Sequence, residues 1–366
     1  MKTDTAQQGI YIHIPFCRSR CAYCGFVSSV CEHSDKDYVE ALVHEIRERV
    51  SGTVDSVYFG GGTPSVLTGG LLKKIVKALR ECAEFSADCE ITTEANPDSF
   101  TDGFAAEAGE CGVNRISFGM QSLNNDVLAA AGRRHTAEQA LAAVERAKSF
   151  GFENLSCDLM LGLPCSSEKD VIASVKTLCE QDIKHLSVYA LSVEKGTPLY
   201  ERGYKVDDDA AADVYEKVCS QLKGYGFERY EVSNFSKRGY ECKHNKKYWT
   251  LAPYVGLGVA AHSYDGTRRS FNTSDIAGYI AGLRDERRET VTASDALEEY
   301  VMLGLRTAEG IDSNRASELC GCEWEQLKSR ELNELIKLGM LERTLKGFKL
   351  SEKAYYVMND IIVRLV

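Results

Sequence analysis

Long hydrophobic runs are missing from this chain of 366 residues. No apolar stretch approaches the roughly 18–20 residues that span a bilayer, and the short, polar segment Met1–Gly9 lacks the pattern of a signal peptide. Basic residues are outnumbered by acidic ones, 44 against 54, which gives a net charge of −10. We therefore expect a cytoplasmic protein without a membrane span and without a nucleic acid partner, because such a partner requires a basic face.

Proline is also sparse, with six residues in the chain. Because proline cannot donate to a strand ladder or within a helix, its positions mark where elements end. Five prolines fall a few residues after a strand-like run and the sixth opens a later loop: Pro15, Pro64, Pro97, Pro164, Pro198 and Pro253. Active sites of parallel β/α barrels form at the C-terminal ends of the strands, so these prolines indicate the functional end of such a fold.

Six strand-like runs alternate with helical patterns. The predicted strands are Ile10–Ile14, Ser56–Phe59, Cys89–Glu94, Val113–Phe118, Asn154–Leu159 and Leu186–Ala190. The predicted helices are Asp37–Val50, Leu71–Cys82, Phe104–Cys111, Ala137–Phe150 after the cap Thr136, and Lys169–Cys179 after the cap Ser167. Successive βα units make parallel, right-handed connections, so we predict an α/β fold with an incomplete parallel (β/α)6 barrel. A doubly wound sheet is the alternative, but no dinucleotide fingerprint supports it.

The C-terminal part of the chain has a different pattern. We predict a helix at 207–226, a strand at 227–232, a polar loop at 234–250, and helices at 296–307, 314–319 and 324–338. Lys346-Gly347 then joins two short strands, as in a winged helix. The predicted divisions are a partial barrel with the cofactor sites (1–206), a linking region (207–293) and a helical, winged-helix-like domain (294–366). The C-terminal domain is too acidic to bind the phosphate backbone of a nucleic acid, and we interpret it as a lid or docking domain.

Cysteine is abundant, with 14 residues, but the chain is too long and too lacking in export signals for a disulfide-rich secreted domain. Cys17, Cys21 and Cys24 lie within eight residues, directly after the first predicted strand. A structural zinc site needs four ligands, and neither Cys31 nor His33 is placed to complete one. Three thiolates on one loop suit a [4Fe–4S] cluster with one open iron, which we predict here.

The spacing C-x3-C-x2-C resembles the signature of the radical S-adenosylmethionine (SAM) superfamily, in which SAM chelates the open iron. The resemblance implies that Tyr23, between the second and third cysteines, packs near the adenine. The run GGGTP, beginning at Gly60, resembles the SAM-binding motif of that superfamily. Because glycine lets a backbone approach a ligand closely, we expect this loop to bind the methionyl amino group.

Polar side chains end or follow the third, fourth and fifth predicted strands. Buried polar groups need partners, and SAM offers an amino group, a sulfonium and a ribose diol to Glu94, Gln121, Arg133 and Asp158. The motifs YIHIPFC, GGGTPS, EANPD, RISFGMQS, DLMLGLP, LSVYAL and YVGLGVAAHSY resemble the oxygen-independent coproporphyrinogen III oxidase-like family over nearly the whole chain. By matching positions, the resemblance implies a SAM site lined by Tyr11, Gly61, Gly62, Thr63, Glu94, Gln121, Arg133, Asp158 and Ala190.

Two features separate the branches of that family. First, the oxidases carry a fourth cysteine two residues after the third, where this chain has Phe26. Second, the run HNKKYW matches the H-N-x-x-Y-W motif of the haem chaperone branch, often called HemW. The resemblance implies that His244 binds haem as a ligand of its iron. Tyr248 and Trp249 could then lie against the porphyrin. Three lysines could pair with its propionates: Lys243, Lys246 and Lys247.

The implied cofactors are a [4Fe–4S] cluster, SAM and haem. The implied partners are haem or another tetrapyrrole, and haem-accepting apo-proteins such as respiratory enzymes. The alternative is an oxygen-independent coproporphyrinogen III oxidase, which decarboxylates propionate side chains oxidatively. Phe26 and His244 favour the chaperone, whereas the intact cysteine triad implies a capacity for SAM cleavage and keeps the enzyme interpretation open. The number of SAM molecules, one or two, stays open too.

Overall fold

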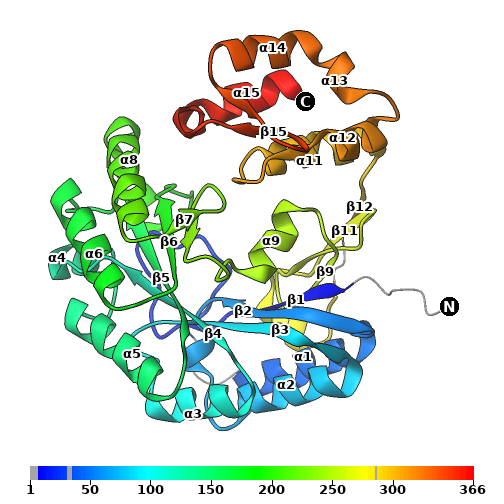
Figure 1. Cartoon of the computed structure of the whole chain (residues 1–366). Coiled ribbons are helices and arrows are strands. Elements are labelled where there is room, and N and C mark those ends of the chain that lie inside the picture. Colours follow the sequence, from blue (N-terminus) through cyan, green and yellow to red (C-terminus); the bar gives the residue numbers. More distant parts are fainter. Residues whose placement is uncertain (1–6, 31–34, 285–286) are drawn as a thin grey trace.

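The computed structural model describes residues 7–30, 35–284 and 287–366; Cys31 and His33 lie outside these ranges. A large curved sheet forms the centre of the molecule, with helices on its outer side and the C-terminal region above it (Figure 1). Its described strands are arranged in the order β12-β11-β10-β9-β1-β2-β3-β4-β5-β6-β8-β7. Seven adjacent strands of this order run parallel to one another: β9 (Tyr254–Leu257), β1 (Gln8–Ile14), β2 (Thr53–Gly61), β3 (Glu84–Ala95), β4 (Arg115–Gln121), β5 (Asn154–Leu161) and β6 (His185–Ala190). The six predicted strands and the partial parallel barrel are confirmed.

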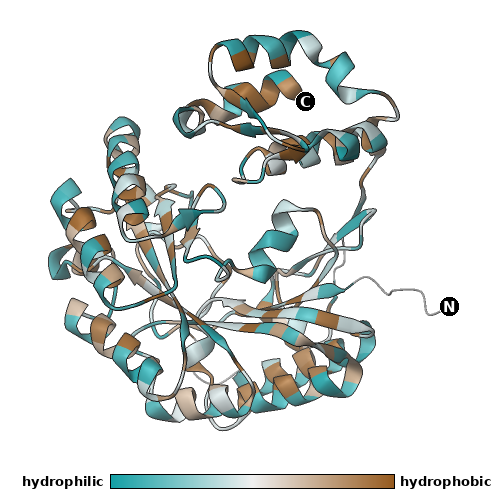
Figure 2. Ribbon diagram, in the orientation of Figure 1, coloured by the Kyte–Doolittle hydropathy of each residue, from teal (hydrophilic) through white to brown (hydrophobic). Residues whose placement is uncertain are grey.

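Helices cover the outer face of this sheet, and the predicted ones are confirmed. Their apolar sides face the sheet and their polar sides face solvent (Figure 2). Thr136 and Ser167 each form a capping box, as predicted. The helices of this part are α1 (Asp35–Arg49), α2 (Leu71–Cys82), α3 (Asp102–Glu110), α4 (Asn125–Ala130), α5 (Ala137–Ser149), α6 (Glu168–Glu180), α7 (Pro198–Glu201) and α8 (Asp208–Gly224). Of the described helices, none is long and apolar enough to cross a membrane.

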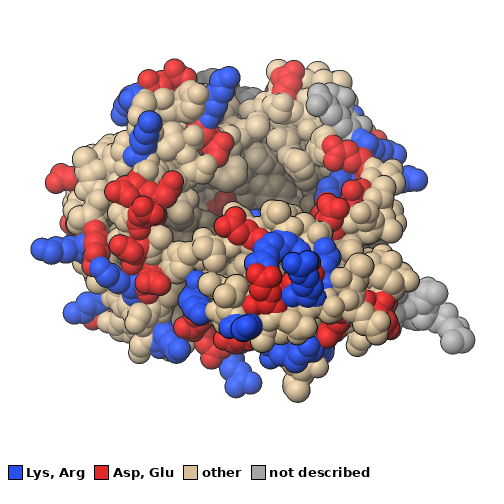
Figure 3. Space-filling model, turned by 90° about the horizontal axis from the view of Figure 1, so that it is seen from above, with Lys and Arg blue, Asp and Glu red and all other residues tan. Residues whose placement is uncertain are grey.

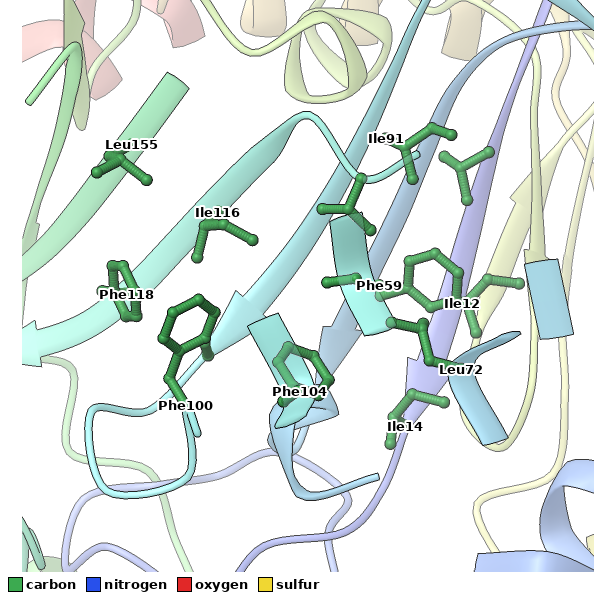
Figure 4. Packing of buried hydrophobic residues seen from close by; sticks show 14 of the residues in the cluster. Ile12, Ile14, Phe59, Leu72, Ile91, Phe100, Phe104, Ile116, Phe118 and Leu155 are labelled. Carbon is green, nitrogen blue, oxygen red and sulfur yellow. The ribbon is translucent and has the colours of Figure 1, made fainter. Parts of the chain in front are cut away.

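The hydrophobic core lies between the sheet and these helices, outside the barrel. Ile12, Phe59 and Ile116 point outward from neighbouring strands, are fully buried, and pack with Leu72 and Phe104 from the helical layer (Figure 4). Because side chains alternate along a strand, the intervening residues point into the barrel, and many of them are polar. The barrel therefore has a polar interior, which we call the lumen.

Strand pairing arranges the lumen in layers. Gly9 and Ser56, toward the N-terminal ends of β1 and β2, are level with Glu90 in the middle of β3. His13 and Gly60 are paired near the C-terminal ends. With about 3.3 Å of rise per residue, these two layers lie roughly 13 Å apart, so the lumen has two distinct ends.

The segment 234–250, predicted as a polar loop, instead contains β8 (Asn234–Ser236) and α9 (Lys243–Trp249), so that prediction is wrong. The helix lacks an apolar period and a side-chain cap at its start, and it is stabilised by tertiary contacts. Glu90 accepts hydrogen bonds from the backbone N–H groups of Lys243 (3.2 Å) and His244 (3.3 Å). The helix lies at the N-terminal end of the lumen.

The parallel strand β9 was not predicted either. Its run YVGL is short and contains Gly256, where a Cβ atom would lie 1.9 Å from the backbone oxygen of His262; such crowding is invisible in the sequence. The predicted strand 227–232 is much shorter in the structure. The remaining elements here are β7 (Glu228–Arg229), β10 (His262–Tyr264), β11 (Arg268–Phe271), α10 (Ile276–Ile280) and β12 (Arg287–Thr290).

The C-terminal region has a second hydrophobic core, centred on Trp324 and Phe348. The predicted hairpin is confirmed and gains a third strand, whereas the predicted helix 324–338 is interrupted at Lys328. The elements are α11 (Ala293–Gly304), β13 (Ile311–Asp312), α12 (Ser313–Cys320), α13 (Trp324–Leu327), α14 (Ser329–Lys337), β14 (Leu341–Arg343), β15 (Gly347–Leu350) and α15 (Met358–Leu365). Seen from above, the molecule is hollowed at its centre, and acidic and basic side chains both border the hollow (Figure 3). The predicted domain boundaries stay a prediction.

Candidate functional site

The three cysteines predicted to bind metal lie on residues 15–30, which we call the cysteine loop, directly after the C-terminal end of β1. Backbone hydrogen bonds join the two ends of this loop to each other and attach its middle to the segment after α4. The Cys17 N–H donates to the Ser29 oxygen (3.0 Å), and the Ala22 N–H donates to the Ala131 oxygen just after α4 (2.9 Å). The cysteines are thereby presented at the same end of the lumen as the last residues of β2–β5.

Two of the sulfur atoms accept hydrogen bonds from other loops. The Thr63 hydroxyl donates to Cys17 Sγ (3.4 Å), and the Arg133 guanidinium donates to Cys21 Sγ (3.3 Å). All three cysteines are half-buried free thiols, and burial raises the pKa of Cys17 and of Cys24. A bound metal deprotonates a coordinating thiol outright, and donors that point at sulfur stabilise the resulting thiolate.

The spacing of these thiols argues for a polynuclear group. Within the described part of the chain, no three His, Cys, Asp or Glu side chains converge on one point as the ligands of a single metal ion must. An iron–sulfur cluster is held by thiolates on separate irons, which need not meet at one point. The thiols of Cys17, Cys21 and Cys24 are of the type that holds an iron–sulfur cluster, and their role as its ligands stays a prediction.

The glycines of residues 60–63, the glycine loop, pack against protein. A Cβ atom on Gly61 would lie 2.6 Å from the His13 ring, and one on Gly62 would lie 2.8 Å from backbone oxygens of β1 and of the cysteine loop. Gly61 also has a φ of +103°, which favours glycine. The glycines are thus required by the fit between loops, which differs from the ligand approach that the sequence led us to expect. SAM binding here stays a prediction.

Two carboxylates share the lumen next to the glycine loop. Tyr58 donates a hydrogen bond to Glu94 Oε1 (2.9 Å), and Ser117 donates one to Asp158 Oδ1 (3.3 Å). Burial and the charge of Asp158 raise the pKa of Glu94 to about 7, and burial also raises the pKa of Asp158. A cationic ligand between the two would oppose both shifts, which suits the amino group or the sulfonium of SAM.

Gln121 and Arg133 bring unpaired polar atoms to this end of the barrel. Arg133 donates to the carbonyl of Gly119 and to Asn96 Oδ1 (2.6 Å), and Asn96 in turn donates to Thr63 (3.0 Å). Gln121 Oε1 and Arg133 Nε are buried without a hydrogen-bond partner among the described residues. Because buried polar atoms are nearly always paired, these two atoms lack partners that a polar ligand could supply.

The remaining predicted SAM residues are more dispersed. Tyr11 lies deeper in the lumen, where its ring stacks on Tyr58 (centroids 6.3 Å apart). Tyr23 packs with the small apolar cluster under the cysteine loop, and burial raises its pKa. Ala190 is exposed at the last position of β6.

Sequence reasoning missed two residues that connect these loops. His13 bonds through Nε2 to the Val27 oxygen (2.9 Å) and so ties β1 to the cysteine loop; burial lowers its pKa. Asn96 joins Arg133 to Thr63, as described above. The alternation in YIHI, which places Tyr11 and His13 on one face, was a usable signal for His13.

His244, the predicted haem ligand, is 1% exposed. Its Nδ1 is hydrogen-bonded to Ser56 Oγ (3.1 Å) and its Nε2 to the Tyr248 hydroxyl (2.9 Å), and its ring stacks on Tyr58 (5.3 Å). Burial and the charge of Lys247 lower the pKa of His244 to about 3, so the ring is neutral. The structure does not bring His244 to the cysteines, and both nitrogens that could bind iron are already engaged.

Comparison with known proteins agrees with this geometry. Residues 11–178 match the radical SAM superfamily, and residues 291–357 match the HemN C-terminal domain. A haem chaperone HemW of Bacillus subtilis is 34% identical and covers 96% of this chain and 97% of its own length. The chain belongs to the HemW family. Other HemW proteins, from Lactococcus lactis and Escherichia coli, are each 32% identical over 96% or more of both chains.

A solved structure shares the architecture of this HemW family member. The coproporphyrinogen III oxidase HemN from Escherichia coli, a radical SAM enzyme, superposes with a TM-score of 0.85 and 22% identity, and covers 98% of this chain and 90% of that one. At this identity the similarity concerns the fold. It agrees with the partial barrel and with the helical C-terminal region.

Proposed function

We propose that this protein is a radical-SAM-type haem chaperone, which binds haem and transfers it to apo-proteins. The proposal is carried by the similarity to curated haem chaperones over nearly the whole length of both chains. Haem, or another tetrapyrrole, is the proposed cargo, and haem-accepting apo-proteins are the proposed partners.

The proposed cofactors are a [4Fe–4S] cluster and SAM. Cys17, Cys21 and Cys24 would hold the cluster, and the donors on Thr63 and Arg133 would stabilise two of the thiolates. With three protein ligands the cluster keeps one iron open, which supplies a binding position for the amino and carboxylate groups of SAM. This assignment follows the sequence prediction and is supported by the hydrogen bonds to sulfur.

The SAM site is proposed at the same end of the lumen. Glu94 and Asp158 would face the positive groups of SAM, and the unpaired atoms of Gln121 and Arg133 would meet its polar groups. Gly61–Thr63, Tyr11, Tyr23 and Ala190 complete the set proposed from the sequence.

The oxidase alternative has no specific observation in its favour. The position that would carry a fourth cysteine is Phe26, which is 67% exposed and cannot bind metal. The likeness to HemN concerns the fold, which both branches share.

Anaerobic reconstitution followed by haem transfer tests this function. Reconstituted protein should contain iron and sulfide, take up haem with a shifted Soret absorbance, and pass the haem to apo-myoglobin. It should leave coproporphyrinogen III unchanged under reducing conditions with SAM. Failure to bind or release haem, or decarboxylation of coproporphyrinogen III at an appreciable rate, would overturn the proposal.

A further inference from the structure

The helix α9 divides the HNKKYW motif between two faces. His244, Lys247 and Tyr248, spaced i, i+3 and i+4, point toward β1, β2 and β9. Besides the His244 contacts described above, the buried Lys247 ammonium pairs with Asp55 (2.8 Å), and the Tyr248 ring packs edge-on against the Tyr254 ring (4.7 Å). This face closes the N-terminal end of the lumen, and its polar side chains are engaged by the protein itself.

The opposite face of α9 lines an open cleft. Lys246, Trp249 and Thr250 have the same spacing, shifted by two residues, and they form one wall of a cleft of about 330 Å³. The other wall belongs to the C-terminal region. We call this space the α9 cleft, and its further lining residues are Tyr230, Tyr300, Gly304, Thr307, Glu309, Gly310, Ile311, Asp312, Arg315 and Lys346.

The lining combines aromatic surface with cations. An indole and two phenol rings line the cleft beside three cationic side chains, Lys246, Arg315 and Lys346, and two carboxylates. Lys246 is paired with Glu309 (2.9 Å), and Asp312 is used to cap α12. Lys346 is exposed and forms no ion pair with any residue that the structure describes. An anionic group could therefore pair with Lys346 without breaking an existing bridge.

We infer that the α9 cleft binds the propionate-bearing edge of haem, with Trp249 against the porphyrin face and Lys346 at a propionate. This inference rests on the proposed function, and it moves the binding surface of the motif from His244 to Trp249. The cleft has the size of small-molecule sites, which begin at roughly 300 Å³, so it accepts one edge of the macrocycle and leaves the rest accessible for transfer. No His, Cys or Met is among the described lining residues, so the cleft recognises the porphyrin and its carboxylates and not the iron.

The inference separates two kinds of haem site by their need for iron. A site built on an axial histidine gains affinity from the bond to iron, so an iron-free porphyrin binds there much more weakly than haem. A site built on stacking and carboxylate pairing accepts both haem and the iron-free porphyrin. Protoporphyrin IX should therefore compete with haem for this protein, with an affinity within about tenfold of that of haem, since only a coordinate bond would enlarge the gap.

The experiment is a haem titration, followed by absorbance, of the full-length protein and three variants, together with protoporphyrin IX competition. Lys346→Glu should weaken haem binding about tenfold, because it replaces an attraction by a repulsion, and added salt should reduce the difference. Trp249→Ala should weaken it by a similar factor through lost stacking. Lys176→Glu, the same charge change on the exposed side of α6, should bind like the wild type.

The outcomes separate this inference from the function on which it rests. Because Lys346 is exposed, its variant should fold even if Trp249→Ala does not. Haem binding by the wild type that neither Lys346→Glu nor protoporphyrin IX affects would overturn the α9 cleft and leave the chaperone function standing. Absence of haem binding by the wild type would overturn both.

Discussion

The two ends of the lumen differ in the polar groups that line them and in the closure of one end by α9. At the cysteine end, Gln121 Oε1 and Arg133 Nε are buried without partners among the described residues, and the charge of Asp158 raises the pKa of Glu94. At the α9 end, both ring nitrogens of His244 have partners, and Lys247 is paired with Asp55. The unpaired atoms at the first end could pair with a polar ligand. At the second end the inner face of α9 is engaged by the protein itself, although Arg115 Nε and Nη1 are also buried there without partners among the described residues. The α9 cleft proposed above lies on the outer face of the helix.

The largest effect is expected when the three thiols at the cysteine end are removed. Replacing Cys17, Cys21 and Cys24 together by Ala should abolish iron and sulfide uptake, because these three thiolates are the proposed ligands of the cluster. Haem binding should persist, since the α9 cleft lies at the other end of the barrel. Iron and sulfide analysis after anaerobic reconstitution measures the uptake of the cluster, and a haem titration measures haem binding. Cys322→Ala, at an exposed free cysteine, is the control. An iron content of the triple variant equal to that of the wild type would contradict the assignment of the three cysteines as cluster ligands.

Removal of the His244 ring should lower the stability of the fold strongly and the affinity for haem only weakly. His244→Ala leaves a cavity and two unpaired partners, Ser56 and Tyr248, in a buried place, so we expect the free energy of unfolding to fall by about 2–4 kcal/mol. Urea unfolding measures this loss. The control is His262→Ala, at an exposed histidine, which should change it little. A variant of unchanged stability that no longer binds haem would restore His244 as a haem ligand.

The sequence predicted the barrel well and α9 poorly, for a physical reason. The six strands and their helices follow from local patterns, since period-two and period-3.6 hydrophobicity report which face is buried. The cysteines were equally visible, because their spacing is local. α9 is held by Glu90 and Asp55, which lie more than 150 residues earlier in the chain, and no local pattern contains that information. The glycine loop was located correctly, but its fit against His13 became apparent only from the coordinates.

A smaller perturbation of the cysteine end is Gly62→Ala. The added methyl group would lie 2.8 Å from two backbone oxygens, and backbone cannot move aside as a flexible side chain can. We expect a loss of about 1–3 kcal/mol in the free energy of unfolding, together with reduced iron uptake, because the cysteine loop is displaced. Gly224→Ala is the matched control, since a Cβ there meets nothing within 4 Å. Normal iron content in Gly62→Ala would show that the contact between the two loops is not needed for the metal site.

The smallest expected effect concerns the protonation of Glu94. Its pKa rises from an ordinary 4.5 to about 7 in the folded protein, because it is buried and faces Asp158. As pH increases from 4.5 to 7, the unfolded chain loses this proton and the folded one keeps it, so the free energy of unfolding falls over this window and the loss is complete above it. At 1.36 kcal/mol per pKa unit the limit is about 3 kcal/mol, and we expect about 1–2 because the Glu94 side chain is only partly buried. Glu94→Gln removes the titration, so the variant should gain stability relative to the wild type between pH 5 and pH 8 in urea unfolding. A difference between the two proteins that does not vary with pH would mean that Glu94 is ionised in the folded state and that the cysteine end already satisfies its charge.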